Sequence, residues 1–147
     1  MLYLLDTDTV IFMVRSSKRR KTSVDYKKSR RLIDRARAEL EAGERVGISA
    51  ITRAELEYGA AKSIDPVKER AAVDKILAPF DEFDFDAGAC ALHYGAIRVE
   101  LERAGELIGA MDLLIAAHAR ALKATLVSNN TRHFKRVKDA KVENWAE

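Results

Sequence analysis

The sequence is poor in cysteine and contains no long apolar run, and each absence excludes a class of protein. The single cysteine, Cys90, has no partner for an internal disulfide, so a disulfide-stapled secreted domain is excluded and a reducing cytoplasm is expected. No stretch reaches the roughly 20 apolar residues that a membrane-spanning helix needs. The apolar run at residues 2–5 stops at Asp6 and lacks a preceding cationic segment, so we expect no signal peptide.

The remaining composition is that of an ordinary folded domain. Of the 147 residues, 48% are hydrophobic, which is enough for a core, and 33% are charged, which provides a well-solvated surface. This length suits one domain spanning residues 1–147, with no internal repeat and no low-complexity tail. The formal charge of +3 favours a polyanionic partner without establishing one.

Apolar runs and helical patterns alternate along the chain. The predicted strands cover residues 2–5, 46–49, 83–85, 125–128 and 141–145. The predicted helices cover residues 9–14, 24–41, a segment opening at 52, and residues 66–77, 87–103 and 111–122. This order predicts an α/β fold, in which a parallel sheet is covered by helices on both faces.

Acidic residues from distant parts of the sequence are predicted to meet at one edge of this sheet. Ligand sites in such folds lie outside the carboxyl ends of the strands. Asp6 and Asp8 follow the first strand, Glu55 follows the second, and Asp112 lies near the start of the helix before the fourth. Clustered carboxylates suit Mg²⁺ or Mn²⁺, and such a metal can activate water for phosphodiester cleavage.

Each of these carboxylates also has a purely structural interpretation. Asp6 or Asp8 can cap the following helix, and capping is the preferred role for Asp8. Residues 52–55, TRAE, have the spacing of a capping box, which on spacing alone favours a structural role for Glu55. Asp112 can be stabilised by the positive end of its helix. Only their joint placement at strand ends favours a catalytic site.

Four sequence blocks resemble those of the PIN-domain nucleases, and in particular of VapC-type toxins. They are residues 4–9 (LLDTDT), 48–59 (ISAITRAELEYG), 108–119 (IGAMDLLIAAHA) and 126–134 (LVSNNTRHF), the last followed by 142–145 (VENW). Each block alone is weak evidence. Together they occur in the family's order and cover nearly the whole chain.

The resemblance implies a three-layer α/β/α PIN-like domain with a central parallel sheet of about five strands. It implies an Mg²⁺- or Mn²⁺-dependent endoribonuclease that is a toxin, a cognate antitoxin protein as partner, and a homodimer. Asp6, Glu55 and Asp112 carry over as the metal-binding carboxylates. Asn130 is the nearest match to a fourth acidic residue of the family, and an amide brings no charge, which puts a second metal in doubt. A structured RNA such as tRNA or rRNA is the family expectation for the substrate.

A basic segment lies between the first two blocks. It contains eight cations, Lys18, Arg19, Arg20, Lys21, Lys27, Lys28, Arg30 and Arg31. Only one acidic residue, Asp25, lies among them in the sequence. This density fits a surface that contacts RNA phosphates, and it fits a solvated helix face equally well.

Two other functions remain open on the sequence. Asp6, Thr7 and Asp8 also match the nucleophile loop of haloacid-dehalogenase-like phosphatases, with Ser49 as a possible second motif. The missing fourth acid keeps a non-catalytic RNA-binding or protein-binding module open. The three histidines, His93, His118 and His133, are not spaced as a zinc set and are interpreted as surface or packed residues.

Overall fold

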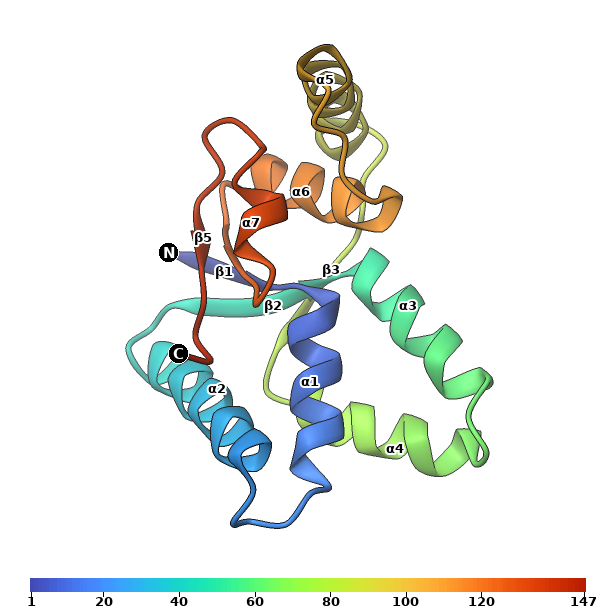
Figure 1. Ribbon diagram of the computed structural model, residues 1–147, viewed down its shortest axis with the longest axis vertical. Coiled ribbons are helices and arrows are strands. Elements are labelled where there is room, and N and C mark those ends of the chain that lie inside the picture. The colour runs from blue at the N-terminus through green and yellow to red at the C-terminus, as the bar shows by residue number, and fades with distance from the viewer.

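Five parallel strands form the central sheet in a computed structural model that describes residues 1–147 (Figure 1). The strands are β1 (Leu2–Leu5), β2 (Arg45–Ser49), β3 (Asp81–Phe83), β4 (Thr125–Val127) and β5 (Val142–Glu143). Their order in the sheet is β3-β2-β1-β4-β5, and every neighbouring pair is parallel. The prediction of a five-stranded parallel α/β fold is confirmed.

Seven helices accompany the sheet. They are α1 (Thr7–Ser17), α2 (Val24–Glu41), α3 (Ala50–Ala61), α4 (Pro66–Leu77), α5 (Ala89–Ala104), α6 (Ala110–Leu122) and α7 (Thr131–Phe134). Figure 1 shows α1 to α4 on one side of the sheet and α5 to α7 on the other, which gives the α/β/α arrangement. None of these helices is both long enough and apolar enough to cross a lipid bilayer.

The central strand β1 contributes side chains to both halves of the core, because successive side chains of a strand point to opposite faces. Tyr3 and Leu5 belong to the cluster under α1 to α4, whereas Leu4 belongs to the cluster under α5 and α6. A strand buried on both faces needs a continuous apolar run, and residues 2–5 provide one.

The strand order reverses next to β1. The chain moves outward from β1 through β2 to β3, then crosses back and adds β4 and β5 on the other side of β1. Such a switch point leaves a crevice at the carboxyl ends of the flanking strands. Here those ends are Leu5 of β1 and Val127 of β4, which are register partners.

Two helix starts differ from the sequence prediction. The helix after β2 begins at Ala50 with Ser49 as its cap, whose hydroxyl accepts the Ile51 N–H at 3.0 Å, so the capping box at residues 52–55 was wrong. Asp6 caps α1 by accepting the Thr9 N–H at 2.8 Å, so the preferred capping role for Asp8 was also wrong. The helix α7 and the two-residue shift of β3 toward the N-terminus were not predicted either.

Candidate active site

Asp6 lies buried at the carboxyl end of β1 and is held at both carboxylate oxygens. Oδ1 accepts the Thr9 N–H, and Oδ2 accepts the Ser128 hydroxyl at 2.5 Å. The Asp6 N–H continues the sheet by donating to the Val127 carbonyl at 3.0 Å. Burial raises the pKa of Asp6 to about 6, and the hydrogen bonds from Ser128 and Thr9 oppose only part of this rise. Asp6 is therefore rigidly placed, and its negative charge is costly.

Asp8 is exposed in the first turn of α1, where it caps nothing. Its charge contributes to raising the pKa of Asp6 and the pKa of Asp112, so it belongs electrostatically to the same cluster. Because the sequence favoured a capping role for it, this placement is a correction. The helix start at Thr7 leaves the Asp8 carboxylate free.

Glu55 lies in the second turn of α3, and the Ser49 cap releases it from any role at the helix start. Thr7 donates its hydroxyl proton to Glu55 Oε1 at 2.6 Å, and the Thr7 and Thr52 hydroxyls lie 3.0 Å apart. These hydroxyls join the start of α1 to α3. Glu55 is thus placed beside the carboxyl end of β1, as the hypothesis of a catalytic edge requires.

Asp112 lies in the first turn of α6 and is about half-buried. Its pKa is raised by burial first, then by the charges of Asp8 and Glu55, and the nearby His133 offsets part of this rise. The structure therefore brings together acidic residues that are more than 100 positions apart in the sequence.

Asn130 and His133 form a polar pair next to Asp112. The Asn130 amide nitrogen lies 2.8 Å from His133 Nδ1, and this Nδ1 lies 3.9 Å from Asp112 Oδ2. Asn130 also donates its backbone N–H to the Ser128 hydroxyl oxygen at 2.8 Å. Asn130 thus lies beside Asp112, and its side chain holds His133. Neither His133 nor Ser128 was among the predicted site residues, although both follow the fourth strand.

The carboxylates at this edge of the sheet are chemically suited to bind a hard divalent cation. Asp6, Asp8 and Glu55 make no ion pair with any lysine or arginine, and Asp112 has only the contact with His133. Carboxylate oxygens without cationic partners are what Mg²⁺ and Mn²⁺ bind. No three acidic, histidine or cysteine side chains converge in a ligating arrangement in this structure, and hydroxyl groups of Ser128 and Thr7 contact Asp6 and Glu55.

Some cations of the basic segment already have partners within the chain. Lys18 pairs with Glu69, Arg19 with Asp25, and Arg30 with Asp34, so Asp25 is not the only acid that opposes it. Arg31 donates to the Ala146 carbonyl. The four cations without such partners are Arg20, Lys21, Lys27 and Lys28. The loop between α1 and α2 lies one length of α1, about 16 Å, from the edge that holds Asp6.

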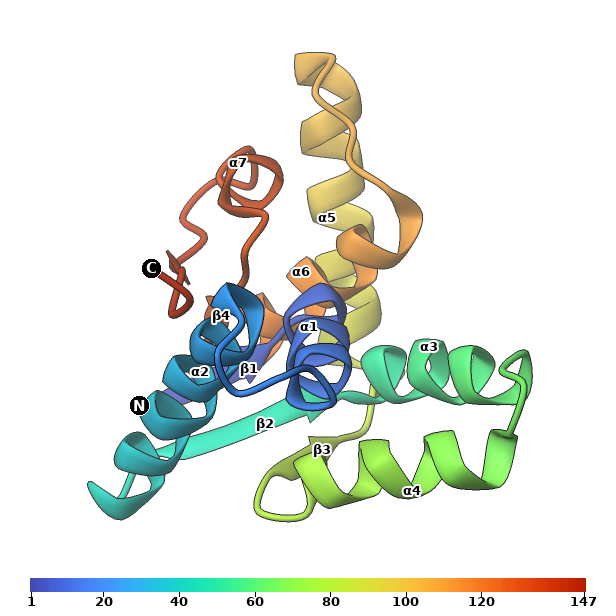
Figure 2. The same cartoon turned by 60° about the horizontal axis from the view of Figure 1, so that its bottom comes forward.

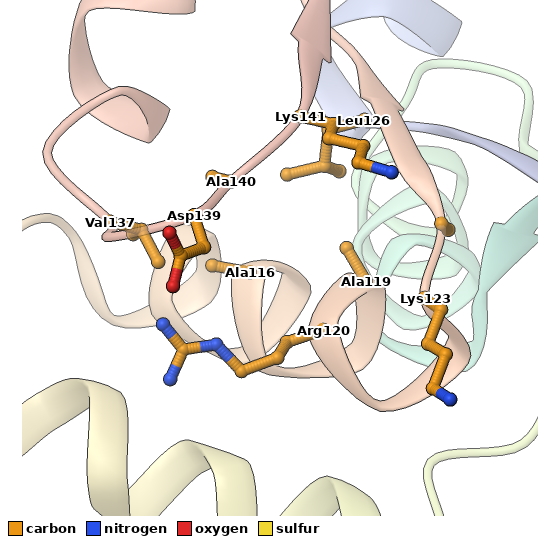
Figure 3. A pocket seen from close by; sticks show the side chains of 10 residues that line it. Ala116, Ala119, Arg120, Lys123, Leu126, Val137, Asp139, Ala140 and Lys141 are labelled. Atoms are coloured by element: carbon orange, nitrogen blue, oxygen red, sulfur yellow. The ribbon is translucent and has the colours of Figure 1, made fainter.

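Two hollows lie outside the carboxylate cluster itself. An apolar cavity of about 280 Å³ opens at the amino ends of β4 and β5, where Figure 3 shows Arg120 and Lys141 around small side chains. It lies at the end of the sheet opposite Asp6 and is no part of the site. A larger groove of about 510 Å³ runs between α1, α3 and α4, helices that lie side by side in Figures 1 and 2, and has Glu55 in its lining.

Comparisons with known proteins agree with this geometry. A family model described as the PIN domain matches residues 3–140. The chain is 37% identical to "Ribonuclease VapC2" of Rickettsia felis, over 99% of this chain and 98% of that protein. It is 38% identical to "tRNA(fMet)-specific endonuclease VapC" of Shigella flexneri, over 98% of each chain. It superimposes with a TM-score of 0.83 on a chain of DNA-bound VapBC from Salmonella typhimurium, at 34% identity over 99% of each chain.

Proposed function

Since the chain belongs to the PIN domain family, and within it to the VapC proteins, we propose that it is a metal-dependent endoribonuclease. It acts in the cytoplasm as the toxin of a toxin–antitoxin pair. The observation that carries the proposal is the cluster of Asp6, Asp8, Glu55 and Asp112, which lacks arginine and lysine partners at the switch point of the sheet. The pKa of Asp6 and the pKa of Asp112 are both raised, so their ionised forms are costly without a cation.

Asp6, Glu55 and Asp112 would hold Mg²⁺ or Mn²⁺. When bound, the metal would supply activated water and neutralise charge on the phosphodiester. Ser128 and Thr9 keep the Asp6 carboxylate in one orientation, so this oxygen pair is preorganised. Thr7 holds Glu55 and can release it to the cation at the cost of one hydrogen bond. Asn130 fixes the ring of His133 beside Asp112.

The phosphatase alternative is not supported by the positions of its required groups. That mechanism needs a lysine and an acidic pair at the tip of a late strand, whereas Ser128, Asn129 and Asn130 follow β4 and Asp112 lies in α6. Ser49 is fully buried and bound to His118 rather than exposed at the edge. The non-catalytic alternative is separated from the nuclease by a cleavage assay.

RNA is the proposed substrate, and tRNA is the first candidate because a relative is named for cleavage of tRNA(fMet). Purified protein is incubated with total tRNA in Mn²⁺, in Mg²⁺ and in EDTA, beside the Asp112→Asn variant. We expect discrete fragments in the metal-containing reactions of the wild type alone. Intact RNA throughout, from a folded protein, would refute the catalytic proposal.

A small antitoxin protein is the proposed partner, because the structural relatives include VapBC complexes. The groove between α1, α3 and α4 is where we place part of it. Apolar Ile11 and Val73 line this groove, and Glu55 links it to the carboxylates, so an occupant there also reaches the site. Replacing Tyr58, an exposed side chain that lines the groove, with Asp should abolish co-purification with the product of an adjacent small reading frame, while Mn²⁺-dependent cleavage persists.

A twofold homodimer is also proposed. Large apolar side chains are exposed on α5, before α6 and in its first turn, namely Leu92, Val99, Leu107 and Met111. An exposed apolar surface of this kind is a common feature of self-association, and twofold dimers are the commonest assemblies. Light scattering that gives a monomer mass at all concentrations would refute the dimer.

A further inference from the structure

A buried histidine and a buried serine join the two helices that carry Glu55 and Asp112. His118 of α6 and Ser49, the cap of α3, both have no solvent exposure. His118 Nδ1 lies 2.6 Å from Ser49 Oγ, and this oxygen also accepts the Ile51 N–H at 3.0 Å. A serine hydroxyl can make both bonds, because it has one donor proton and two lone pairs.

The two residues of this pair lie at equal sequence distances from the two carboxylates. Ser49 precedes Glu55 by six residues, and His118 follows Asp112 by six residues. At about 1.5 Å per residue, each carboxylate lies about 9 Å along its helix from the hydrogen bond. A rotation of α6 relative to α3 at this contact therefore changes the separation of Asp112 and Glu55.

Apart from Ser49, the polar groups that act on the His118 ring are the backbone of Asp84 and the charges of Asp86 and Asp84. Phe85 packs edge-on against it, with ring centroids 5.5 Å apart and planes at 81°. Nε2 has no hydrogen-bond partner of ordinary geometry. Burial lowers the pKa of His118, which keeps the ring neutral, and either neutral tautomer can form the bond to Ser49. An apolar side chain would fill the same space without an orphaned nitrogen, so packing alone does not explain a histidine here.

We propose that His118 is a positioning residue, which by its hydrogen bond to Ser49 fixes α6 against α3 and sets the separation of Asp112 and Glu55. The inference rests on the proposed function, because it takes these two carboxylates as ligands of one metal. A metal site tolerates little displacement of its ligands, and loss of a residue that orients a ligand typically weakens metal binding about 10- to 100-fold.

Two substitutions separate this role from simple packing. His118→Phe keeps a ring in the core and removes the hydrogen bond. His118→Asn leaves a cavity, and its amide ends close to the position of Nδ1, so it can still bond to Ser49. We expect the Asn variant to unfold at a lower temperature than the Phe variant. We nevertheless expect it to bind Mn²⁺ more tightly than the Phe variant does.

The readout is Mn²⁺ affinity without RNA, measured from the electron paramagnetic resonance signal of free Mn²⁺, beside thermal melting. His118→Phe should bind about tenfold more weakly than the wild type, and His118→Asn should stay within about threefold of it. Ile115→Val, another fully buried change in α6, should leave the affinity unchanged. Ser49→Ala and His118→Phe should not add in their effects, because they remove the same bond.

The outcomes distinguish the two proposals. If the wild type binds Mn²⁺ and the folded Phe variant binds equally well, the positioning role is overturned and the proposed function stands. Affinities that simply follow the melting temperatures would also overturn the positioning role. If the wild type fails to bind Mn²⁺, the proposed function falls and this inference falls with it. Should His118→Phe not fold, His118→Leu replaces it, because leucine also fills apolar space without a hydrogen bond to Ser49 and leaves the Ser49 cap of α3 in place.

Discussion

The acidic residues around Arg53, on the α3–α4 flank, have a cationic partner, whereas those at the carboxyl edge of the sheet have none. On the flank, Arg53 forms two hydrogen bonds with Glu82, at 2.7 and 3.0 Å, and also pairs with Asp74 and Glu57. At the edge, Asp6, Asp8 and Glu55 have no cationic partner.

The difference shows in the pKa values. The Arg53 guanidinium lowers the pKa of Glu82, whereas burial and neighbouring acids raise the pKa of Asp6 and of Asp112. An arginine therefore neutralises acids on the flank, whereas no lysine or arginine does so at the edge. Acids with shifted pKa values and no cationic partner are enriched at functional sites, and this supports the proposed metal site.

The largest expected effect comes from removing one charge at the edge. Asp112→Asn should lower metal-dependent RNA cleavage at least about 100-fold, because the site loses charge with little change of shape. Its melting temperature without metal should stay the same or rise, since the pKa of Asp112 is raised by burial and by the charges of Asp8 and Glu55. If Asp112 served only the helix terminus, the change would cost about 0.3–1 kcal/mol and spare cleavage. Cleavage and melting of one preparation decide between these patterns.

The second expected effect is a pH dependence of stability due to Asp6. Because its pKa is about 6 in the folded chain and 3.8 as the reference, folding favours the protonated form. The stabilisation is complete below about pH 4 and is lost as pH rises through about 6, by at most about 3 kcal/mol. Denaturant unfolding of the wild type and Asp6→Asn between pH 4 and 7, without metal, tests this. The variant should lose the downward slope, and an equal slope in both would assign it to other groups.

The third expected effect extends the comparison from acids to cations. Replacing the four unpartnered cations Arg20, Lys21, Lys27 and Lys28 with Gln should weaken tRNA binding about tenfold and flatten its dependence on salt. The matched control neutralises four cations that are already paired with acids, Lys18, Arg19, Arg30 and Arg35. Filter binding at several salt concentrations measures both. Equal effects of the two sets would show that pairing within the chain does not matter for RNA contact.

The smallest expected effect comes from the flank. Arg53→Met should destabilise the fold by about 1 kcal/mol, since each partly exposed pair contributes little but three acids lose one partner. Arg98→Met, which removes an exposed pair with Glu102 within one helix, should cost less. Denaturant unfolding measures both variants. Loss of cleavage in a folded Arg53→Met variant would mean that the flank is not independent of the edge.

The sequence predicted the framework well because its signals are local. Continuous apolar runs placed β1, β2 and β4 within a residue or two, and the helices predicted at residues 66–77 and 111–122 agree with α4 and, within one residue, with α6. The start of α3 was misplaced because Ser49 and Thr52 are both suitable caps, and only the structure shows which one accepts an N–H. The short helix α7 has too few residues to show a periodicity.

The candidate site was predictable as a set of acids but not as a set of contacts. Strand ends brought Asp6, Glu55 and Asp112 to one edge, since parallel strands share their carboxyl side. The bond from Ser128 to Asp6 and the approach of His133 to Asp112 join segments that are distant in sequence. No local pattern predicts such pairs, so the roles of Ser128 and His133 became visible only in three dimensions.

A crystal structure of the protein with MnCl₂, with anomalous diffraction recorded near the manganese edge, tests the central claim most directly. The account predicts an anomalous peak coordinated by Asp6, Glu55 and Asp112, with Glu55 released from Thr7. It also predicts that the peak disappears in Asp112→Asn crystals grown in the same way. A peak located elsewhere, or none at the carboxyl edge under saturating Mn²⁺, would contradict the claim that these unpaired carboxylates form a metal site.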